Sequence, residues 1–159
     1  MSGFSISRAG NDLQDAAYAI VTEYYAAVGV ELREDGAAFG AYYFGHGSGL
    51  WLASSGSGVV GCIALRPLVP TGPAAVSEPC GEVKRLYVRP LWRGKGIADK
   101  LLDSLHEYAA SVGYRWLYLD SKDDLDVAIR FYQRRGYQVC ERYNNNPQAT
   151  VFMRRMIAP

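Results

Sequence analysis

Hydrophobic and polar residues alternate over several short runs in the first half of the chain, and a period of two predicts β-strands. The run FSISRA at residues 4–9 alternates in this way and predicts a short first strand. Two longer apolar runs, LWLAS at residues 50–54 and VVGCIALRPL at residues 59–68, flank Ser-Gly-Ser-Gly at residues 55–58. Two such runs joined by a short, glycine-containing turn predict a β-hairpin.

A helical period marks residues 11–30, NDLQDAAYAIVTEYYAAVGV. We expect Asn11 to cap this helix together with Gln14, three residues further on, and Gly29 to end it. The glycine-rich and aromatic residues 31–49 predict a short helix followed by a loop.

The second half of the chain combines both periods. EVKRLYV at residues 82–88 is rich in β-branched and aromatic residues and predicts a strand, which Pro90 ends because proline cannot donate to a strand ladder. From Gly96 onward apolar residues recur at helical spacing, and Gly113 is the expected end of that helix.

The remaining residues predict one more strand, one more helix and two closing strands around the turn-rich NNNPQ. These elements are expected at residues 114–120, 124–136, 137–143 and 149–157. The chain of 159 residues is long enough for one full core, and neither a linker nor an internal repeat interrupts it. We therefore expect a single mixed α/β domain over residues 1–159.

Composition argues against two classes of partner. The formal net charge is +1, whereas proteins that bind nucleic acid or a membrane surface normally carry a marked basic excess. No apolar run approaches membrane-spanning length, and the first residues lack the apolar centre of a signal peptide. The three cysteines form no C-x-x-C pattern, which favours a reducing compartment. We expect a cytoplasmic protein with neither nucleic-acid nor membrane partners.

Basic residues nevertheless gather in one part of the chain. Between residues 84 and 100 only Asp99 opposes Lys84, Arg85, Arg89, Arg93, Lys95 and Lys100. The stretch RPLWRGKGIADKLL at residues 89–102 sets two glycines among these cations at an expected helix start. The first amides of a helix lack partners and carry partial positive charge, and glycine lets an anion approach the backbone. The stretch predicts a phosphate-binding loop.

Two common nucleotide loops do not fit this stretch. The NTPase loop requires G-x-x-x-x-G-K-[ST], but Gly94-Lys95 is followed by Gly96 and has no earlier matching glycine. The dinucleotide loop G-x-G-x-x-G requires a glycine where this chain has Asp99. A plain turn with a solvated basic face is the simpler alternative.

The loop and its flanking segments resemble those of the GNAT (Gcn5-related) N-acetyltransferases. Residues 93–98, RGKGIA, match that family's R/Q-x-x-G-x-G/A signature. EVKRLYVRP before the loop and AIRFYQRRGY at residues 128–137 are similar to its lead-in strand and late helix-turn segment. EYYAAVGVEL and ERYNNNPQATVFM resemble a subgroup of small bacterial GNAT proteins. The resemblance implies a central, mostly antiparallel, twisted sheet flanked by helices.

The resemblance also implies that acetyl-CoA is the acetyl donor. Its pyrophosphate would be held by the backbone amides of Arg93, Gly94, Lys95, Gly96, Ile97 and Ala98. Its pantetheine arm would pair with the backbone of Leu86, Tyr87 and Val88 like an added strand.

Further coenzyme contacts are expected in the late helical segment. The family pattern places Phe131 among them. Many relatives carry an asparagine ahead of this segment, where this chain has Leu125 and Asp126. We expect Ser121 or Lys122 to replace that contact.

Transfer of an acetyl group from a thioester to an amine needs a proton acceptor for the amine and a proton donor for the departing thiolate. By resemblance, the acceptor is Glu82, acting directly or through water, and by alternation it shares a strand face with Leu86 and Val88. The donor is Tyr132 in FYQRRGY. The alternatives are that Glu82 pairs with Lys84 or Arg85 and that Tyr132 is a core residue.

Other reactive side chains fit the pattern of a catalyst or a metal ligand poorly. His46 reads as a loop residue and His106 as a surface residue, and no cysteine has a histidine nearby in sequence. Asp120, Asp123, Asp124 and Asp126 lack the glycine and terminal glutamate of a calcium loop, so helix capping explains them better. We expect no metal.

The acceptor is expected among aromatic and polar side chains. The predicted wall consists of Tyr24, Tyr25, Arg33, Tyr42, Tyr43, Phe44 and residues 143–146. Such a wall suits a small amine, an amino-acid-like molecule or a peptide N-terminus. The alternative function is a non-catalytic module of the same fold that binds acetyl-CoA as a sensor. The tyrosine content and the β-rich C-terminus permit a homodimer.

Overall fold

The computed structural model describes residues 3–29, 43–56, 58–122 and 125–157. The chain divides into two compact units. Unit 1 consists of Met1–Arg66 and Lys84–Tyr108, and unit 2 consists of Pro67–Val83 and Ala109–Pro159. The segments of the predicted phosphate loop belong to unit 1, whereas Glu82 and Tyr132 belong to unit 2.

Unit 1 contains the first strands of the sheet and the first helices. Its described elements are β1 (Ser5–Arg8), the 3₁₀ helix η1 (Asn11–Leu13), α1 (Gln14–Val28), β2 (Gly49–Ser55), β3 (Gly58–Leu68), β4 (Cys80–Val88), the 3₁₀ helix η2 (Pro90–Trp92) and α3 (Ile97–Ser111). β3, β4 and α3 also contribute residues to unit 2. β1 pairs antiparallel with β2, and β2 pairs antiparallel with β3.

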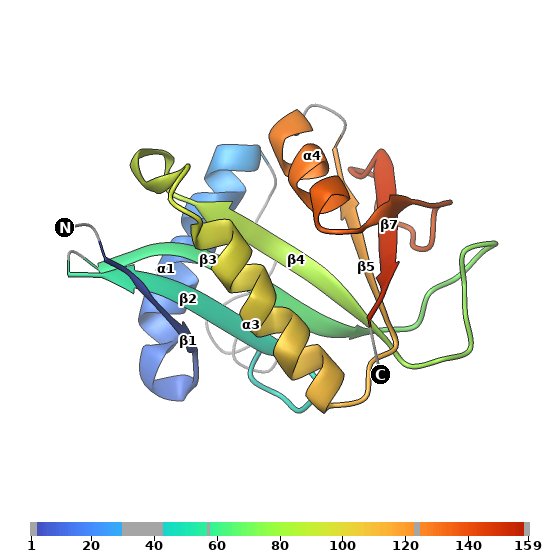
Figure 1. Cartoon of the computed structure of the whole chain (residues 1–159), viewed down its shortest axis with the longest axis horizontal. Coiled ribbons are helices and arrows are strands. Elements are labelled where there is room, and N and C mark those ends of the chain that lie inside the picture. The colour runs from blue at the N-terminus through green and yellow to red at the C-terminus, as the bar shows by residue number, and fades with distance from the viewer. Residues whose placement is uncertain (1–2, 30–42, 57, 123–124, 158–159) are drawn as a thin grey trace. The chain divides into compact units, whose positions relative to one another are not determined.

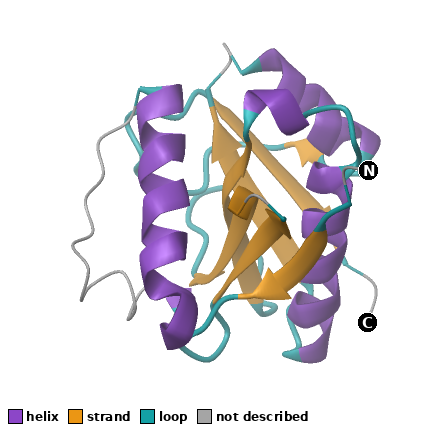
Figure 2. Cartoon of the chain, turned by 90° about the vertical axis from the view of Figure 1, so that its left-hand side faces the viewer, coloured by secondary structure: helices purple, strands orange, loops and turns teal. Residues whose placement is uncertain are grey.

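Strand β2 is buried on both faces, which explains its unbroken apolar run. Alternate residues of a strand point to opposite faces. Leu50 and Leu52 join a buried cluster with Ile20 of α1. The ring of Trp51, between them, lies 5.5 Å from the ring of Tyr108 on α3, measured between centroids. α1 and α3 therefore cover opposite faces of the unit 1 strands, as Figures 1 and 2 show.

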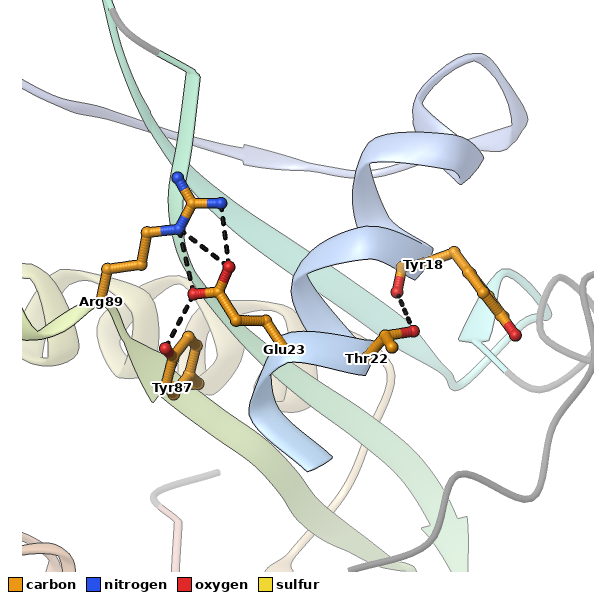
Figure 3. A network of polar contacts seen from close by, with 5 residues as sticks. All are labelled: Tyr18, Thr22, Glu23, Tyr87 and Arg89. Carbon is orange, nitrogen blue, oxygen red and sulfur yellow. Dashed lines mark hydrogen bonds and ion pairs between the residues drawn. The ribbon is translucent and has the colours of Figure 1, made fainter. Parts of the chain in front are cut away.

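A polar network ties α1 to the end of β4 (Figure 3). Tyr87 donates its hydroxyl hydrogen to Oε2 of Glu23 at 2.8 Å. Arg89 donates from Nε to both oxygens of Glu23, at 3.2 and 3.1 Å, and from Nη2 to Oε1 at 3.1 Å. The hydrogen bond from Arg89 holds the pKa of the Glu23 carboxyl below its ordinary value of 4.5, against the opposing effect of partial burial.

Unit 2 contains the last three strands and the last helix. Its further elements are β5 (Trp116–Ser121), α4 (Asp126–Arg134), β6 (Gln138–Val139) and β7 (Val151–Met156). β4 and β5 pair in parallel over Cys80 to Glu82, whereas β7 pairs antiparallel with both β5 and β6. The strand order of the seven-stranded sheet is β1-β2-β3-β4-β5-β7-β6. The expected mixed, mostly antiparallel sheet flanked by helices is confirmed.

Aromatic rings form the centre of unit 2. The rings of Tyr118 and Tyr143 lie 4.9 Å apart, and Phe152 of β7 packs edge-to-face on Tyr143 at 5.6 Å. The small residues Ala74 and Ala149 fill the remaining space in this cluster. The large rings contribute most of the buried apolar surface of this unit.

Most of the elements expected from the sequence are confirmed. β2 and β3 form the expected hairpin, with Ser55 opposite Gly58. Gly29 ends α1 in a left-handed conformation and donates its N–H to the carbonyl of Tyr25. Gly113 and Gly136 also have positive φ angles, at 92° and 89°, where the helices before them were expected to stop.

The expected helix caps are wrong. Asn11 does not cap α1, because the 3₁₀ helix η1 comes first and the helix begins after Leu13, which makes no side-chain cap. The acidic residues do not cap α4 either, since its N-cap is Leu125 without a side-chain hydrogen bond. Asp120 accepts hydrogen bonds from asparagine side chains instead. Asp123 and Asp124 lie outside the described residues.

The strand expected at residues 137–143 is much shorter than the sequence pattern suggested. β6 covers Gln138 and Val139 alone. The guanidinium of Arg142 donates to the carbonyls of Asn144, Asn146 and Ala149, although the first of these contacts is long at 3.4 Å. These side-chain donors hold the loop that follows the expected strand.

None of the helices in the described part of the chain has both the length and the apolar character needed to cross a bilayer.

Replacing Gly61 of β3 with alanine is expected to destabilise the protein by about 1–3 kcal/mol, the usual cost of overpacking. A Cβ there would lie 2.9 Å from the carbonyl oxygen of Tyr87 and within 3.5 Å of Val88 and Ile97. Urea unfolding measures the effect. Gly56→Ala is the matched control, since a Cβ at Gly56 meets nothing within 4 Å. Equal stability of the two variants would contradict the close approach of β3 and β4.

Glu23→Gln is expected to lower the free energy of unfolding at neutral pH by at most about 1 kcal/mol, because the pair is partly exposed. The folded pKa of Glu23 is depressed, so its contribution is present above the ordinary value of 4.5 and disappears as pH falls below it. Urea unfolding near pH 7 and near pH 3 gives the comparison. Glu107→Gln, at an exposed position of α3, is the control. A wild-type-to-variant difference that does not shrink in acid would contradict the ion pair.

Candidate functional site

The predicted phosphate loop lies between η2 and α3 in unit 1. Gly94 and Gly96 adopt left-handed conformations, with φ angles of 79° and 81°. Side chains rarely adopt this region, so the loop needs glycine at both positions. Both are exposed, and a Cβ on either would meet nothing within 4 Å. The backbone at these two residues is therefore open to a ligand.

The electrostatics of this loop suit an anion. α3 begins at Ile97 and runs for 15 residues, so its N-terminal amides follow directly on the glycines. Arg93 and Lys95 are exposed beside them, whereas Ile97 is buried and anchors the helix start. Backbone N–H groups, the helix dipole and two cations together favour a phosphate group. Residues 93–98 therefore have the features of an anion site, and their contact with the pyrophosphate of a coenzyme stays a prediction.

The first cation of the loop folds back onto β4. Nε of Arg93 donates to the carbonyl oxygen of Val88 at 2.8 Å. Its guanidinium carbon lies 6.0 Å from the ring centre of Tyr87. The Val88 carbonyl, which was expected to pair with a pantetheine arm, thus already accepts a hydrogen bond from the chain itself.

The middle of β4 departs from regular strand geometry at Arg85, which has a φ angle of 61°. A left-handed residue in a strand marks a bulge. Nε of Arg85 donates to the hydroxyl of Tyr43 at 3.0 Å, and its guanidinium lies over the ring of Tyr25 at 4.8 Å. The Arg85 carbonyl accepts from Sγ of Cys62 at 3.1 Å. Strict alternation therefore fails at this point, and the face shared by Glu82, Leu86 and Val88 no longer follows from counting residues.

Glu82 of β4 lies inside unit 2 and is only 4% exposed. Its Oε2 accepts a hydrogen bond from the hydroxyl of Tyr143 at 2.7 Å and a longer one from Nδ2 of Asn144 at 3.3 Å. The same Nδ2 donates to Oδ2 of Asp120 at 2.7 Å. A fourth side chain, Asn146, donates to that Asp120 oxygen at 3.1 Å.

No local sequence pattern predicts this network. Residues 144–148 were interpreted as a turn, and Asp120 was interpreted as a helix cap. Tyr143 was expected to line an acceptor site, but it is completely buried. Polar residues brought together from β4, β5 and the last loop lie far apart in sequence, so no local spacing reveals them. The run of three asparagines in NNNPQ is the one sequence feature that marks this loop.

Tyr132 lies on α4 and is 6% exposed. Its ring packs edge-to-face between Phe131, at 5.4 Å, and Tyr137, at 5.3 Å. These contacts establish a packing role for Tyr132. Proton donation by its hydroxyl remains a prediction, as does coenzyme contact by Phe131.

The residues expected to replace the family asparagine lie at the end of β5. The Ser121 carbonyl accepts the N–H of Thr150 at 2.9 Å, and the Lys122 carbonyl accepts the N–H of Leu125 at 3.0 Å. Both backbones are held in defined positions. Contact of Ser121 or Lys122 with a coenzyme stays a prediction.

The predicted acceptor wall is dispersed. Tyr25 and Tyr43 are buried in the core of unit 1 around Arg85, so they offer little surface to a ligand. Tyr24 and Phe44 are partly buried against the same core. Arg33 and Tyr42 lie outside the described residues.

The cysteines are poor nucleophiles. Burial raises the pKa of Cys62 to about 12 and that of Cys80 to about 11, so both remain thiols at neutral pH. Cys62, Cys80 and Cys140 are free of disulfides. His46 is exposed in a turn, as expected. In the described ranges of the chain, no three His, Cys, Asp or Glu residues are grouped so as to hold a metal ion.

Comparison with known sequences gives one consistent family. The model of the acetyltransferase (GNAT) family matches residues 14–137. An uncharacterized N-acetyltransferase of Schizosaccharomyces pombe is 36% identical over 97 residues, which are 61% of this chain and 55% of that protein. The uncharacterized N-acetyltransferase YjgM of Escherichia coli is 34% identical over 58% of this chain and 52% of its own length. The chain thus spans about half the length of the curated relatives it matches.

Solved structures show the same fold over nearly the whole chain. A GNAT acetyltransferase of Staphylococcus aureus has a TM-score of 0.79 at 17% identity and covers 98% of this chain and 100% of its own. A Klebsiella pneumoniae protein described as a putative acyl-CoA N-acyltransferase has a TM-score of 0.70 at 25% identity, with 98% of each chain covered. Arabidopsis thaliana NAA60, solved with acetyl-CoA, has a TM-score of 0.73 at 14% identity and covers 98% of this chain and 99% of its own.

The glycine loop at the start of α3, the strand order and the match over residues 14–137 agree with one another. The chain belongs to the acetyltransferase (GNAT) family.

Proposed function

We propose that this protein is an acetyl-CoA-dependent N-acetyltransferase that transfers the acetyl group directly to a primary amine. The loop of residues 93–98 carries this proposal, because its two left-handed glycines expose backbone at the N-terminus of a 15-residue helix. The acceptor is a small amine, an amino-acid-like molecule or a peptide N-terminus. No covalent enzyme intermediate is required.

The donor is held by its phosphates and by its arm. Amides of residues 93–98 and the cations Arg93 and Lys95 bind the pyrophosphate. The end of β4, from Leu86 to Val88, offers backbone groups to the pantetheine amides. Arg93 releases the Val88 carbonyl when its guanidinium turns toward the phosphates. The solved complex of NAA60, a protein of the same fold, with acetyl-CoA supports acetyl-CoA as the donor.

Glu82 accepts the proton of the acceptor amine. An N–H bond of the amine breaks, its electron pair stays on nitrogen for attack on the thioester carbon, and an O–H bond forms on the carboxylate. Tyr132 donates a proton to the departing thiolate. Ser121, Lys122 and Phe131 complete the coenzyme contacts.

The acceptor class rests on broader grounds. NAA60 has also been solved with a bisubstrate analogue, which supports an amine-bearing acceptor for proteins of this fold.

The family match includes residues of both compact units, which supports a single functional domain over residues 1–159. Three unpaired cysteines favour a reducing, cytoplasmic site of action. Homodimer formation stays a prediction.

Gly96→Ala is expected to weaken coenzyme A binding by about tenfold or more, since a left-handed alanine costs roughly 1–2 kcal/mol and the loop relaxes away from the ligand. Isothermal titration with coenzyme A gives the dissociation constant. Gly113→Ala is the matched control, because Gly113 also has positive φ and open space but ends α3. It carries the same backbone strain far along the helix from the loop. Equal binding by both variants would contradict a phosphate site at residues 93–98.

Glu82→Gln is expected to lower kcat/KM by about 100-fold or more, and Tyr132→Phe by about 10-fold or more, within the usual range for acid–base residues. The affinity for coenzyme A should change little. Release of coenzyme A thiol from acetyl-CoA, across amines, amino acids and peptides, measures turnover. Tyr137→Phe is the control for Tyr132→Phe, since it removes a hydroxyl from a neighbouring buried ring.

Two results would contradict the proposal. Wild-type turnover in Glu82→Gln would remove the role of Glu82. Tight binding of acetyl-CoA with no turnover of any amine would favour the non-catalytic sensor of the same fold.

A further inference from the structure

The turn at residues 144–148 orients two asparagine side chains in the same way. Oδ1 of Asn144 accepts the backbone N–H of Asn146 at 3.0 Å, and Oδ1 of Asn146 accepts the backbone N–H of Gln148 at 3.0 Å. Each is an Asx turn, in which the side-chain oxygen is fixed by the backbone two residues further on. Because the oxygen of each amide is committed, its NH₂ group points the other way.

Both NH₂ groups are aimed at carboxylates. Nδ2 of Asn144 donates to Oδ2 of Asp120 at 2.7 Å and to Oε2 of Glu82 at 3.3 Å. Nδ2 of Asn146 donates to the same Asp120 oxygen at 3.1 Å. An amide NH₂ has two hydrogens, so Asn144 supplies one to each carboxylate. It thereby links the two acidic side chains through donors alone.

A second donor reaches Glu82 from the neighbouring residue. The hydroxyl of Tyr143 lies 2.7 Å from Oε2 of Glu82, with both side chains buried. Thr71 holds the backbone of this tyrosine, donating to its carbonyl from both N and Oγ1 at 2.9 Å. Arg142 holds the carbonyls of the loop on the other side of it. The two donors to Glu82 are thus fixed by backbone contacts on both sides.

We propose that Tyr143 and Asn144 are positioning residues that hold the Glu82 carboxylate in one orientation as the proton acceptor of the transfer reaction. The inference rests on the proposed role of Glu82. Neither residue touches the substrates in this scheme. Asp120 and Asn146 act on Glu82 indirectly, because they fix the side-chain amide of Asn144.

Two hydrogen bonds to one carboxylate favour its charged form, because a protonated carboxyl accepts them less well. The titratable groups that act on Tyr143 are Glu82, Asp120 and Cys140. Burial, together with the carboxylates of Glu82 and Asp120, raises the pKa of Tyr143, so its hydroxyl remains a donor throughout the working pH range. Asp120 adds negative charge near Glu82, and the NH₂ group of Asn144 lies between the two carboxylates.

Asn144→Asp separates the two tasks of this side chain. The aspartate keeps the oxygen that accepts the N–H of Asn146, so the turn is preserved. It loses the NH₂ donor and adds a third negative charge. We expect kcat/KM at neutral pH to fall about tenfold and the acidic limb of its pH profile to move up by about one pH unit. The KM for acetyl-CoA should stay within about twofold of wild type, because the coenzyme loop is untouched.

Two further variants make the test specific. Tyr143→Phe removes the other donor without adding charge, keeps the ring in the core and should move the acidic limb in the same direction by a smaller amount. Gln148→Glu adds one charge to the same loop while retaining the backbone N–H that binds Asn146. It should leave the acidic limb where it is. Circular dichroism and urea unfolding report whether each variant is folded.

The outcomes distinguish this inference from the proposed function. If Glu82→Gln keeps wild-type turnover, the proposed base role fails and the inference fails with it. If Glu82→Gln is inactive but Asn144→Asp and Tyr143→Phe keep the wild-type pH profile, the inference alone is overturned. Loss of activity without movement of the acidic limb would reduce Tyr143 and Asn144 to structural residues. If Asn144→Asp does not fold, the Tyr143→Phe profile decides.

Discussion

The left-handed backbone of Arg85 is the constraint on which the described site depends. A non-glycine residue in this region costs of order 1 to 3 kcal/mol and persists only where its surroundings hold it. Here Cys62 donates to its carbonyl, Tyr43 accepts from its guanidinium, and Tyr25 packs beneath it. The left-handed Arg85 interrupts the regular strand geometry of β4. Without it, a regular strand would keep strict alternation through Glu82 and Tyr87.

Polar side chains near this strand form two separate hydrogen-bond networks. In unit 1, Tyr87 and Arg89 converge on Glu23, which ties the end of β4 to α1 just before the glycine loop. In unit 2, Tyr143 and Asn144 converge on Glu82. Each network joins a carboxylate to donors from distant parts of the sequence. Strand β4 therefore carries Tyr87, which donates to the carboxylate of Glu23, and also carries the second carboxylate, that of Glu82.

The parts of this molecule that local sequence rules determine were predicted correctly. Two apolar runs around a glycine-containing turn located β2 and β3, and the preference for glycine at a helix end located Gly29 after α1. Prediction from the sequence failed where a tertiary contact determines the structure instead. Leu13 begins α1 without a cap because a 3₁₀ turn precedes it, and after β6 ends at Val139 the guanidinium of Arg142 holds the loop carbonyls. The bulge at Arg85 has no composition cue at all. The donors to Glu82 were equally hidden, since their partners lie more than 60 residues away.

The hydrogen bond from Arg93 to the Val88 carbonyl has a consequence for selectivity among donors. A pantetheine amide that takes over this carbonyl exchanges one hydrogen bond for another, and such an exchange yields little net free energy. The gain comes when the released guanidinium meets a phosphate. Fragments that contain the pantetheine arm but no phosphate break the hydrogen bond from Arg93 and offer its guanidinium no new partner. With the donor bound as proposed, this hydrogen bond would disfavour short thioesters that lack a phosphate.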